Sequence, residues 1–170
     1  MSNKIGGIVF NDTANAPGIC TSVYLTGCPI HCKGCHNPEL WDDTKGIPYA
    51  DKYDVIKESL NANGVNRTLC ILGGEPLAPY NVEATFNLIN MAKPKNKVCI
   101  WTGYELDELR QRISDSNPDI VDQHTVMYIL ESIDTMVVGR YIEELRDVTL
   151  KMRGSSNQII MDKEDITKWL

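Results

Sequence analysis

Short apolar runs alternate with stretches of helical periodicity along most of the chain. The runs predict strands at residues 5–10, 19–26, 68–72, 97–102, 133–138 and 157–161. In the second run Ile19, Val23 and Leu25 alternate with Tyr24 and other residues that face the opposite side. The pattern therefore predicts five or six strands.

Helical spacing appears between these runs. Residues 51–61 place Tyr53, Ile56 and Leu60 on one face, and residues 81–91 carry a similar apolar stripe. The pattern also predicts helices at residues 105–113 and 163–170.

Strands separated by helices are typical of right-handed βαβ crossovers in a parallel sheet. The chain has 170 residues, whereas a complete eight-unit barrel needs about 200 or more. We therefore expect one α/β domain over residues 1–170, built as an open or partial (β/α) barrel with mostly parallel strands. Ligands of such sheets collect beyond the carboxyl ends of the strands.

Composition excludes several classes of protein. The net charge is −6 and no long Lys/Arg cluster is present, so nucleic-acid binding is not expected. No apolar run approaches the length of a membrane span, and no signal-like segment follows Met1. We expect a cytoplasmic protein whose thiols stay reduced.

The chain has six cysteines, and three of them lie in strand-like runs. Cys70 and Cys99 are interpreted as small buried residues, and Cys20 similarly, because free cysteine is among the most buried residue types.

The other three form the spacing Cys-x3-Cys-x2-Cys at Cys28, Cys32 and Cys35, in a loop at residues 27–37. Three thiolates can hold three corners of a cubane iron–sulfur cluster and leave one iron open to a small molecule. The spacing alone leaves two alternatives open, unligated thiols and a structural zinc site completed by His31 or His36.

A second motif is Gly73-Gly74-Glu75-Pro76, which directly follows an apolar strand. Two glycines let a backbone approach a ligand closely, and Glu75 could accept a charge-assisted hydrogen bond from an ammonium group. By itself the motif is a plain turn in most proteins, and it gains meaning only together with the cysteines upstream.

Together the two motifs resemble the radical S-adenosylmethionine superfamily. Further stretches resemble the activating enzymes of anaerobic (class III) ribonucleotide reductases, and the resemblance spans about residues 10–160. These stretches are Asn15-Ala-Pro-Gly18, Thr26-Gly-Cys28, Cys35-His-Asn-Pro-Glu39, Trp41, Trp101-Thr-Gly-Tyr104 and Arg153-Gly-Ser-Ser-Asn-Gln158. The chain departs from the family pattern in having Ala16 within the first stretch, Ile19 after it, and Arg140 after Gly139.

The resemblance implies a fold of the radical S-adenosylmethionine type and a [4Fe–4S] cluster on Cys28, Cys32 and Cys35. It implies reductive cleavage of S-adenosylmethionine to a 5′-deoxyadenosyl radical, which generates a glycyl radical on the large subunit of the reductase. By the same resemblance, the residues expected to contact S-adenosylmethionine are Gly34, Cys35, His36, Gly73, Gly74, Glu75 and Thr102.

Other functions remain alternatives at this point. The chain could activate another glycyl-radical enzyme, such as pyruvate formate-lyase, or modify a small molecule such as a deazaguanine precursor. A zinc-binding interaction module is the alternative that involves no catalysis. A flavodoxin-like electron donor is expected, with Lys33 and Lys45 as candidates for docking it.

Overall fold

The computed structural model describes residues 3–114, 116 and 118–170. Seven strands form one open sheet in the order β3-β1-β2-β4-β5-β6-β7. Their bounds are β1 Lys4–Asp12, β2 Cys20–Leu25, β3 Ile47–Pro48, β4 Thr68–Gly73, β5 Val98–Thr102, β6 Thr135–Val138 and β7 Ile159–Asp162.

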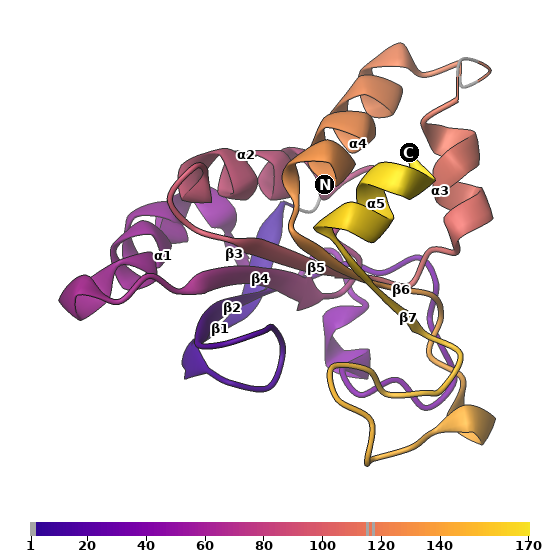
Figure 1. Cartoon of the computed structure of the whole chain (residues 1–170), viewed down its shortest axis with the longest axis horizontal. Coiled ribbons are helices and arrows are strands. Elements are labelled where there is room, and N and C mark those ends of the chain that lie inside the picture. The colour runs from indigo at the N-terminus through magenta and orange to yellow at the C-terminus, as the bar shows by residue number, and fades with distance from the viewer. Residues whose placement is uncertain (1–2, 115, 117) are drawn as a thin grey trace.

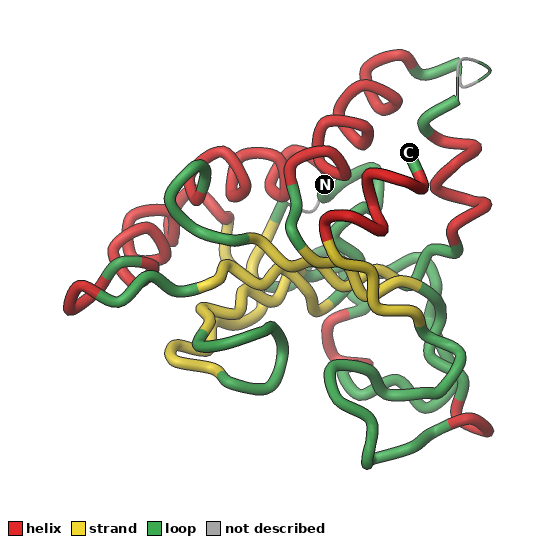
Figure 2. Tube along the Cα trace, in the orientation of Figure 1, coloured by secondary structure: helices red, strands yellow, loops and turns green. Residues whose placement is uncertain are grey.

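Five α-helices lie on one face of this sheet, as Figures 1 and 2 show. They are α1 Tyr53–Leu60, α2 Val82–Ala92, α3 Leu106–Arg112, α4 Ile120–Ser132 and α5 Lys163–Trp169. Between helices and sheet lies the main core, which includes Ile56, Ile71, Leu88, Ile100 and Leu130.

The predicted open or partial (β/α) barrel of the radical S-adenosylmethionine type, with mostly parallel strands, is wrong, because the strands form one open sheet of mixed direction. β2, β4, β5 and β6 pair in parallel, but β1 is antiparallel to β2 and β3, and β7 is antiparallel to β6. A parallel pair needs a crossover, usually a helix. The links β1–β2 and β6–β7 contain no α-helix, so both strands return antiparallel and the sheet cannot continue into a barrel.

All six predicted strands and four predicted helices are found, with ends displaced by a few residues. The sequence reasoning missed the two-residue β3 and the helix α4. Asp119 begins α4 by accepting a hydrogen bond from the Asp122 amide. Ile120 and Val121 are exposed whereas Val126 and Ile129 are buried, so the apolar residues of α4 do not mark one face.

The second face of the sheet carries no α-helix in the described part of the chain, only short 3-10 turns within its loops. A small cluster of Ala16, Cys20, Cys70, Leu72 and Cys99 is buried there, and Tyr24, Trp101 and Met152 pack against it. The three cysteines are fully buried, which confirms their interpretation as core residues. Loops cover this face: the one after β1, the long one after β2, and the one between β6 and β7 (Figure 1).

No helix in the described part of the chain has the length and the apolar run needed to cross a lipid bilayer.

Candidate functional site

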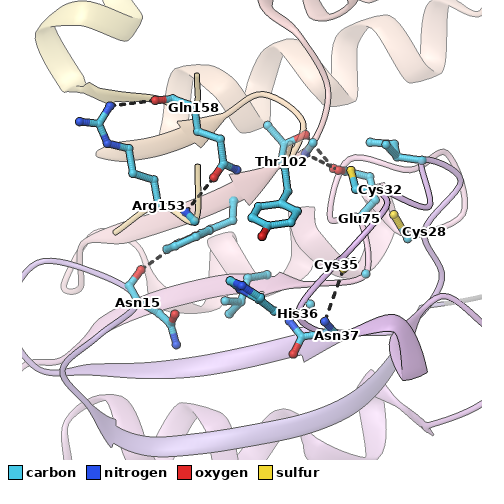
Figure 3. A pocket seen from close by; sticks show the side chains of 18 of the residues that line it. Asn15, Cys28, Cys32, Cys35, His36, Asn37, Glu75, Thr102, Arg153 and Gln158 are labelled. Atoms are coloured by element: carbon cyan, nitrogen blue, oxygen red, sulfur yellow. Dashed lines mark hydrogen bonds between the residues drawn. The ribbon is translucent and has the colours of Figure 1, made fainter. Parts of the chain in front are cut away.

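A cavity of about 450 Å³ lies on this loop-covered face, where the parallel strands end. Leu72 and Gly73 end β4 and Gly74 and Glu75 follow it, Trp101 to Gly103 lie at the end of β5, and Gly139 follows β6. The cavity is closed by the loop after β2 and by the segment between β6 and β7 (Figure 3). Parallel pairing of four strands thus brings four separate loops to one place.

The cysteine loop contributes three thiols to the cavity wall. Cys28, Cys32 and Cys35 all line the cavity and are all free, half-buried thiols. The Cys28 amide donates to the Trp41 carbonyl at 3.2 Å, and the Cys35 amide donates to the Cys32 carbonyl at 3.1 Å. These bonds fold residues 28–41 back on themselves, so cysteines spread over eight positions face one space.

Burial raises the pKa of the Cys28 thiol, although the amides of Ile30 and His31 oppose the shift by hydrogen bonding. Burial also raises the pKa of Cys32, and the Tyr141 amide opposes that shift. The Asn37 amide donates to the Cys35 sulfur at 3.4 Å. Amide donors aimed at sulfur stabilise thiolate over thiol, the form in which cysteine binds iron.

The donor set suits an iron–sulfur cluster. Within the described residues, no three His, Cys, Asp or Glu side chains converge closely enough to hold a single metal ion. The two candidate histidines are packed against aromatic rings: His31 stacks on Trp41 at 4.6 Å between centroids, and His36 tilts against Tyr141 at 5.1 Å. What the loop offers the cavity is three thiols, the ligand type that holds iron–sulfur clusters.

The Gly-Gly-Glu turn packs directly against the start of the cysteine loop. The Glu75 amide donates to the Gly27 carbonyl at 2.8 Å, and the Gly74 amide donates to the Leu25 carbonyl at 2.8 Å. A Cβ on Gly74 would lie 2.3 Å from the Gly27 oxygen, and Gly73 has φ = +107°. Both glycines are therefore needed for the approach of two backbones, and both also line the cavity.

Glu75 is 1% exposed and lies between two turns. Its Oε1 accepts from the Leu77 amide at 2.9 Å and from the Thr102 hydroxyl at 2.8 Å. Its Oε2 accepts from the Gly103 amide at 2.7 Å. Burial outweighs these bonds and raises the pKa of Glu75 to about 7. The carboxyl group thus ties the end of β4 to the end of β5.

Asn81 is a buried residue of this site that sequence reasoning missed. Its side-chain amide donates to the Thr26 carbonyl at 2.9 Å and to the Glu75 carbonyl at 3.0 Å, and its side-chain oxygen accepts from the Asn3 amide. Asn81 therefore joins the cysteine loop to the Gly-Gly-Glu turn. Its place just before α2 is the only local signal, and an asparagine there is ordinarily interpreted as a cap.

The segment between β6 and β7 forms the outer wall. Gln158 organises it, because its Oε1 accepts from the Gly154 and Ser155 amides and its Nε2 donates to the Gly139 carbonyl at 3.1 Å. Arg140 pairs with Glu108 of α3 at 2.7 Å. Sequence reasoning missed the cavity-lining Tyr141, Leu150 and Met152, which carry no motif.

Six of the seven residues expected to contact S-adenosylmethionine line the cavity: Cys35, His36, Gly73, Gly74, Glu75 and Thr102. Gly34 does not. It has φ = +75°, and a Cβ there would lie 2.3 Å from Glu143. Lys33, a candidate for docking an electron donor, forms an exposed ion pair with Glu144 at 3.2 Å.

The stretches that carried the family resemblance meet at the same cavity. Asn15, Trp41, Trp101 and Arg153 all line it, although they are separated along the chain. The Asn15 carbonyl accepts from the Trp101 indole at 2.8 Å and from the Cys70 thiol at 3.2 Å. This contact holds the loop after β1 against the sheet.

Residues 14–161 match the model of a family described as a 4Fe–4S single cluster domain. The chain is also similar to proteins named anaerobic ribonucleoside-triphosphate reductase-activating protein. The relative from Escherichia coli K12 is 31% identical over 88% of this chain and 92% of its own length. The relative from Vibrio cholerae is 32% identical over 88% and 91%. The relative from Enterobacteria phage T4 is 28% identical over 91% and 90%.

Proposed function

This chain belongs to the family of anaerobic ribonucleoside-triphosphate reductase-activating proteins with a 4Fe–4S single cluster domain, and from that premise we propose its reaction. It cleaves S-adenosylmethionine reductively and generates a glycyl radical on the large subunit of an anaerobic ribonucleoside-triphosphate reductase. The observation that carries the proposal is the shared cavity, which three free thiols and the Gly-Gly-Glu turn line together.

Cys28, Cys32 and Cys35 would hold a [4Fe–4S] cluster whose fourth iron has no protein ligand. When bound, the cluster supplies one electron that breaks the bond between sulfur and C5′ of S-adenosylmethionine, which releases methionine and a 5′-deoxyadenosyl radical. That radical takes a hydrogen atom from a glycine α-carbon of the reductase and becomes 5′-deoxyadenosine.

The residues of the chain bind and orient the substrate in this scheme. Glu75 is assigned to the methionyl ammonium, because Oε2 accepts one protein hydrogen bond and can accept another. Gly73 and Gly74 bring backbone groups to the same end, and Thr102 acts there through its bond to Glu75. Cys35 and His36, which line the cavity, are assigned to the adenine side, whereas Gly34 lies outside the cavity and would act only by shaping the loop.

The cavity walls have a second task, which is to exclude water and competing hydrogen donors. The floor includes Tyr24, Leu72 and Trp101, and the outer wall adds Leu150 and Met152. A mostly apolar enclosure restricts a reactive radical to the substrate placed beside it.

We also propose a cellular compartment and an electron donor for the protein. All six cysteines are free, which supports a reducing compartment, the cytoplasm. The single electron requires a donor, for which we propose a small flavodoxin-like protein.

Electron paramagnetic resonance tests the reaction. Oxygen-free protein is mixed with its reductase, S-adenosylmethionine and a reductant, and a glycyl doublet together with 5′-deoxyadenosine is expected. Iron should measure about four per chain, the content of one cubane. Colourless protein containing one zinc, or the absence of a doublet with the correct reductase, would refute the proposal. Omission of S-adenosylmethionine is the control.

A further inference from the structure

Two aromatic rings from different loops meet at the wall of the cavity. His36 follows the last cysteine of the cysteine loop, and Tyr141 lies on the segment between β6 and β7. Their ring centroids are 5.1 Å apart and their planes are inclined by 47°. Both residues line the cavity and neither is buried, so ring surface is available to a ligand. Figure 3 shows His36 displaced from Cys28 and Glu75 toward Arg153.

The missing side chain of Gly154 makes room for this pair of rings. A Cβ on Gly154 would lie 3.0 Å from the Tyr141 ring and 3.3 Å from the His36 ring. The backbone there is itself held in place, because the Gly154 amide donates to Gln158 Oε1 at 2.9 Å and the Gly154 carbonyl accepts from the Asp147 amide at 3.2 Å. A side chain at position 154 would therefore displace the rings rather than the backbone.

Tyr141 is fixed at both its ring and its main chain. The hydroxyl donates to Glu143 Oε2 at 2.5 Å, and the amide donates to the sulfur of Cys32. The hydroxyl proton is thus already used within the protein, and what Tyr141 offers the cavity is the surface of its ring. A ring held at a fixed place costs little further ordering when a flat ligand packs on it.

We propose that Tyr141 packs against the adenine ring of S-adenosylmethionine and, together with His36, determines where the base lies. This inference rests on the proposed function, which assigns the methionyl group to the Glu75 end and the base to the side of His36. Aromatic side chains bind nucleobases through stacked or edge contacts. Two rings inclined by 47° offer one ring for stacking and the other for an edge contact. With both ends of the ligand held, the bond between sulfur and C5′ stays beside the thiols.

Affinity measurements by equilibrium dialysis on cluster-loaded, oxygen-free protein separate the two ends of the ligand. Tyr141→Ala should weaken binding of S-adenosylmethionine and of 5′-deoxyadenosine by about 5- to 150-fold, the range for one lost base–aromatic stack. Binding of methionine should stay within about twofold, because methionine has no base. Tyr141→Phe retains the ring and should bind all three ligands with affinity close to that of the wild-type protein.

Gly154→Ala tests the same wall without removing a ring. The added Cβ should displace the two rings, so affinity for 5′-deoxyadenosine should fall by about fivefold or more while methionine binding is retained. Ile142→Ala is the matched control, because Ile142 directly follows Tyr141, is 37% exposed and does not line the cavity. This control should leave all three affinities unchanged. Iron is measured in every variant and should equal that of the wild-type protein.

Three results would overturn the inference. These are an unchanged affinity for 5′-deoxyadenosine in Tyr141→Ala, an equal loss of methionine binding, or loss of iron in both Tyr141→Ala and Gly154→Ala, which would mean a structural role. The first result combined with a raised KM for the reductase would show that the ring contacts the partner protein instead. Failure of the wild-type protein to bind S-adenosylmethionine would refute the proposed function itself.

Discussion

Glu75 makes the stability of this protein depend on pH in a direction unusual for a carboxylate. Burial raises its pKa from 4.5 to about 7. Between these values the unfolded chain releases a proton that the folded protein keeps, so the free energy of unfolding falls as pH rises. The fall ends once the pH passes about 7 and the folded protein ionises as well.

The magnitude follows from the shift, because Glu75 is 1% exposed and solvent screens it little. Integrated from pH 5 to pH 8, the shift is worth about 2–3 kcal/mol. Glu75→Gln keeps the size of the side chain and removes its titration. The wild-type protein should therefore lose about 2–3 kcal/mol more than the variant over this interval.

This difference is measured by urea unfolding of the wild-type protein and Glu75→Gln at pH 5 and pH 8. Tryptophan fluorescence is the readout, and both proteins are kept free of oxygen and matched in iron content. Groups that titrate equally in both proteins cancel. Glu164→Gln is the control, because the Glu164 side chain is 75% exposed and its solvation changes little on folding. Equal pH dependence in wild type and Glu75→Gln would refute the reasoning, since it would mean that burial does not penalise this carboxylate.

Three other substitutions test the site. Cys32→Ser should abolish cluster assembly, whereas Cys70→Ser, in the small buried core on the second face of the sheet, should retain iron; equal iron loss would contradict the ligand assignment. Gly74→Ala should lower the free energy of unfolding by about 2–3 kcal/mol through its clash with a carbonyl, while Gly7→Ala, whose Cβ meets nothing within 4 Å, should change it by less than about 0.5 kcal/mol. Asn81→Ala should cost at least about 2 kcal/mol in thermal unfolding because it leaves buried groups unpaired; an unchanged midpoint would contradict that role.

Local sequence patterns were sufficient to predict those helices and strands whose apolar residues repeat with one clear period. Ile56 and Leu60 are buried on α1 as their spacing predicts, and Cys70 and Cys99 are buried in strands. The helix α4 escaped prediction because Ile120 and Val121 are apolar yet exposed. The barrel prediction failed because strand direction depends on what connects the strands, which periodicity does not reveal.

In the site too, residues within a local motif could be predicted, whereas residues brought in by the fold could not. The cysteine spacing and the Gly-Gly-Glu motif marked residues that line one cavity, since each motif is a short stretch with its own chemistry. Tyr141 and Met152 reach that cavity only because the segment between β6 and β7 folds back across the sheet. Neither has neighbours in the sequence that distinguish it from an ordinary loop residue.

The sequence by itself predicted three candidate cluster ligands, most of the strands and helices, and the family, because these depend on residue type at fixed local spacing. Only the tertiary structure decided that Glu75 is buried between two turns, that Gly74 must lack a Cβ, and that Tyr141 packs against His36. The physical reason is that burial, close backbone approach and ring packing are relations between residues distant in sequence. They exist only once the parallel strands bring their carboxyl ends together.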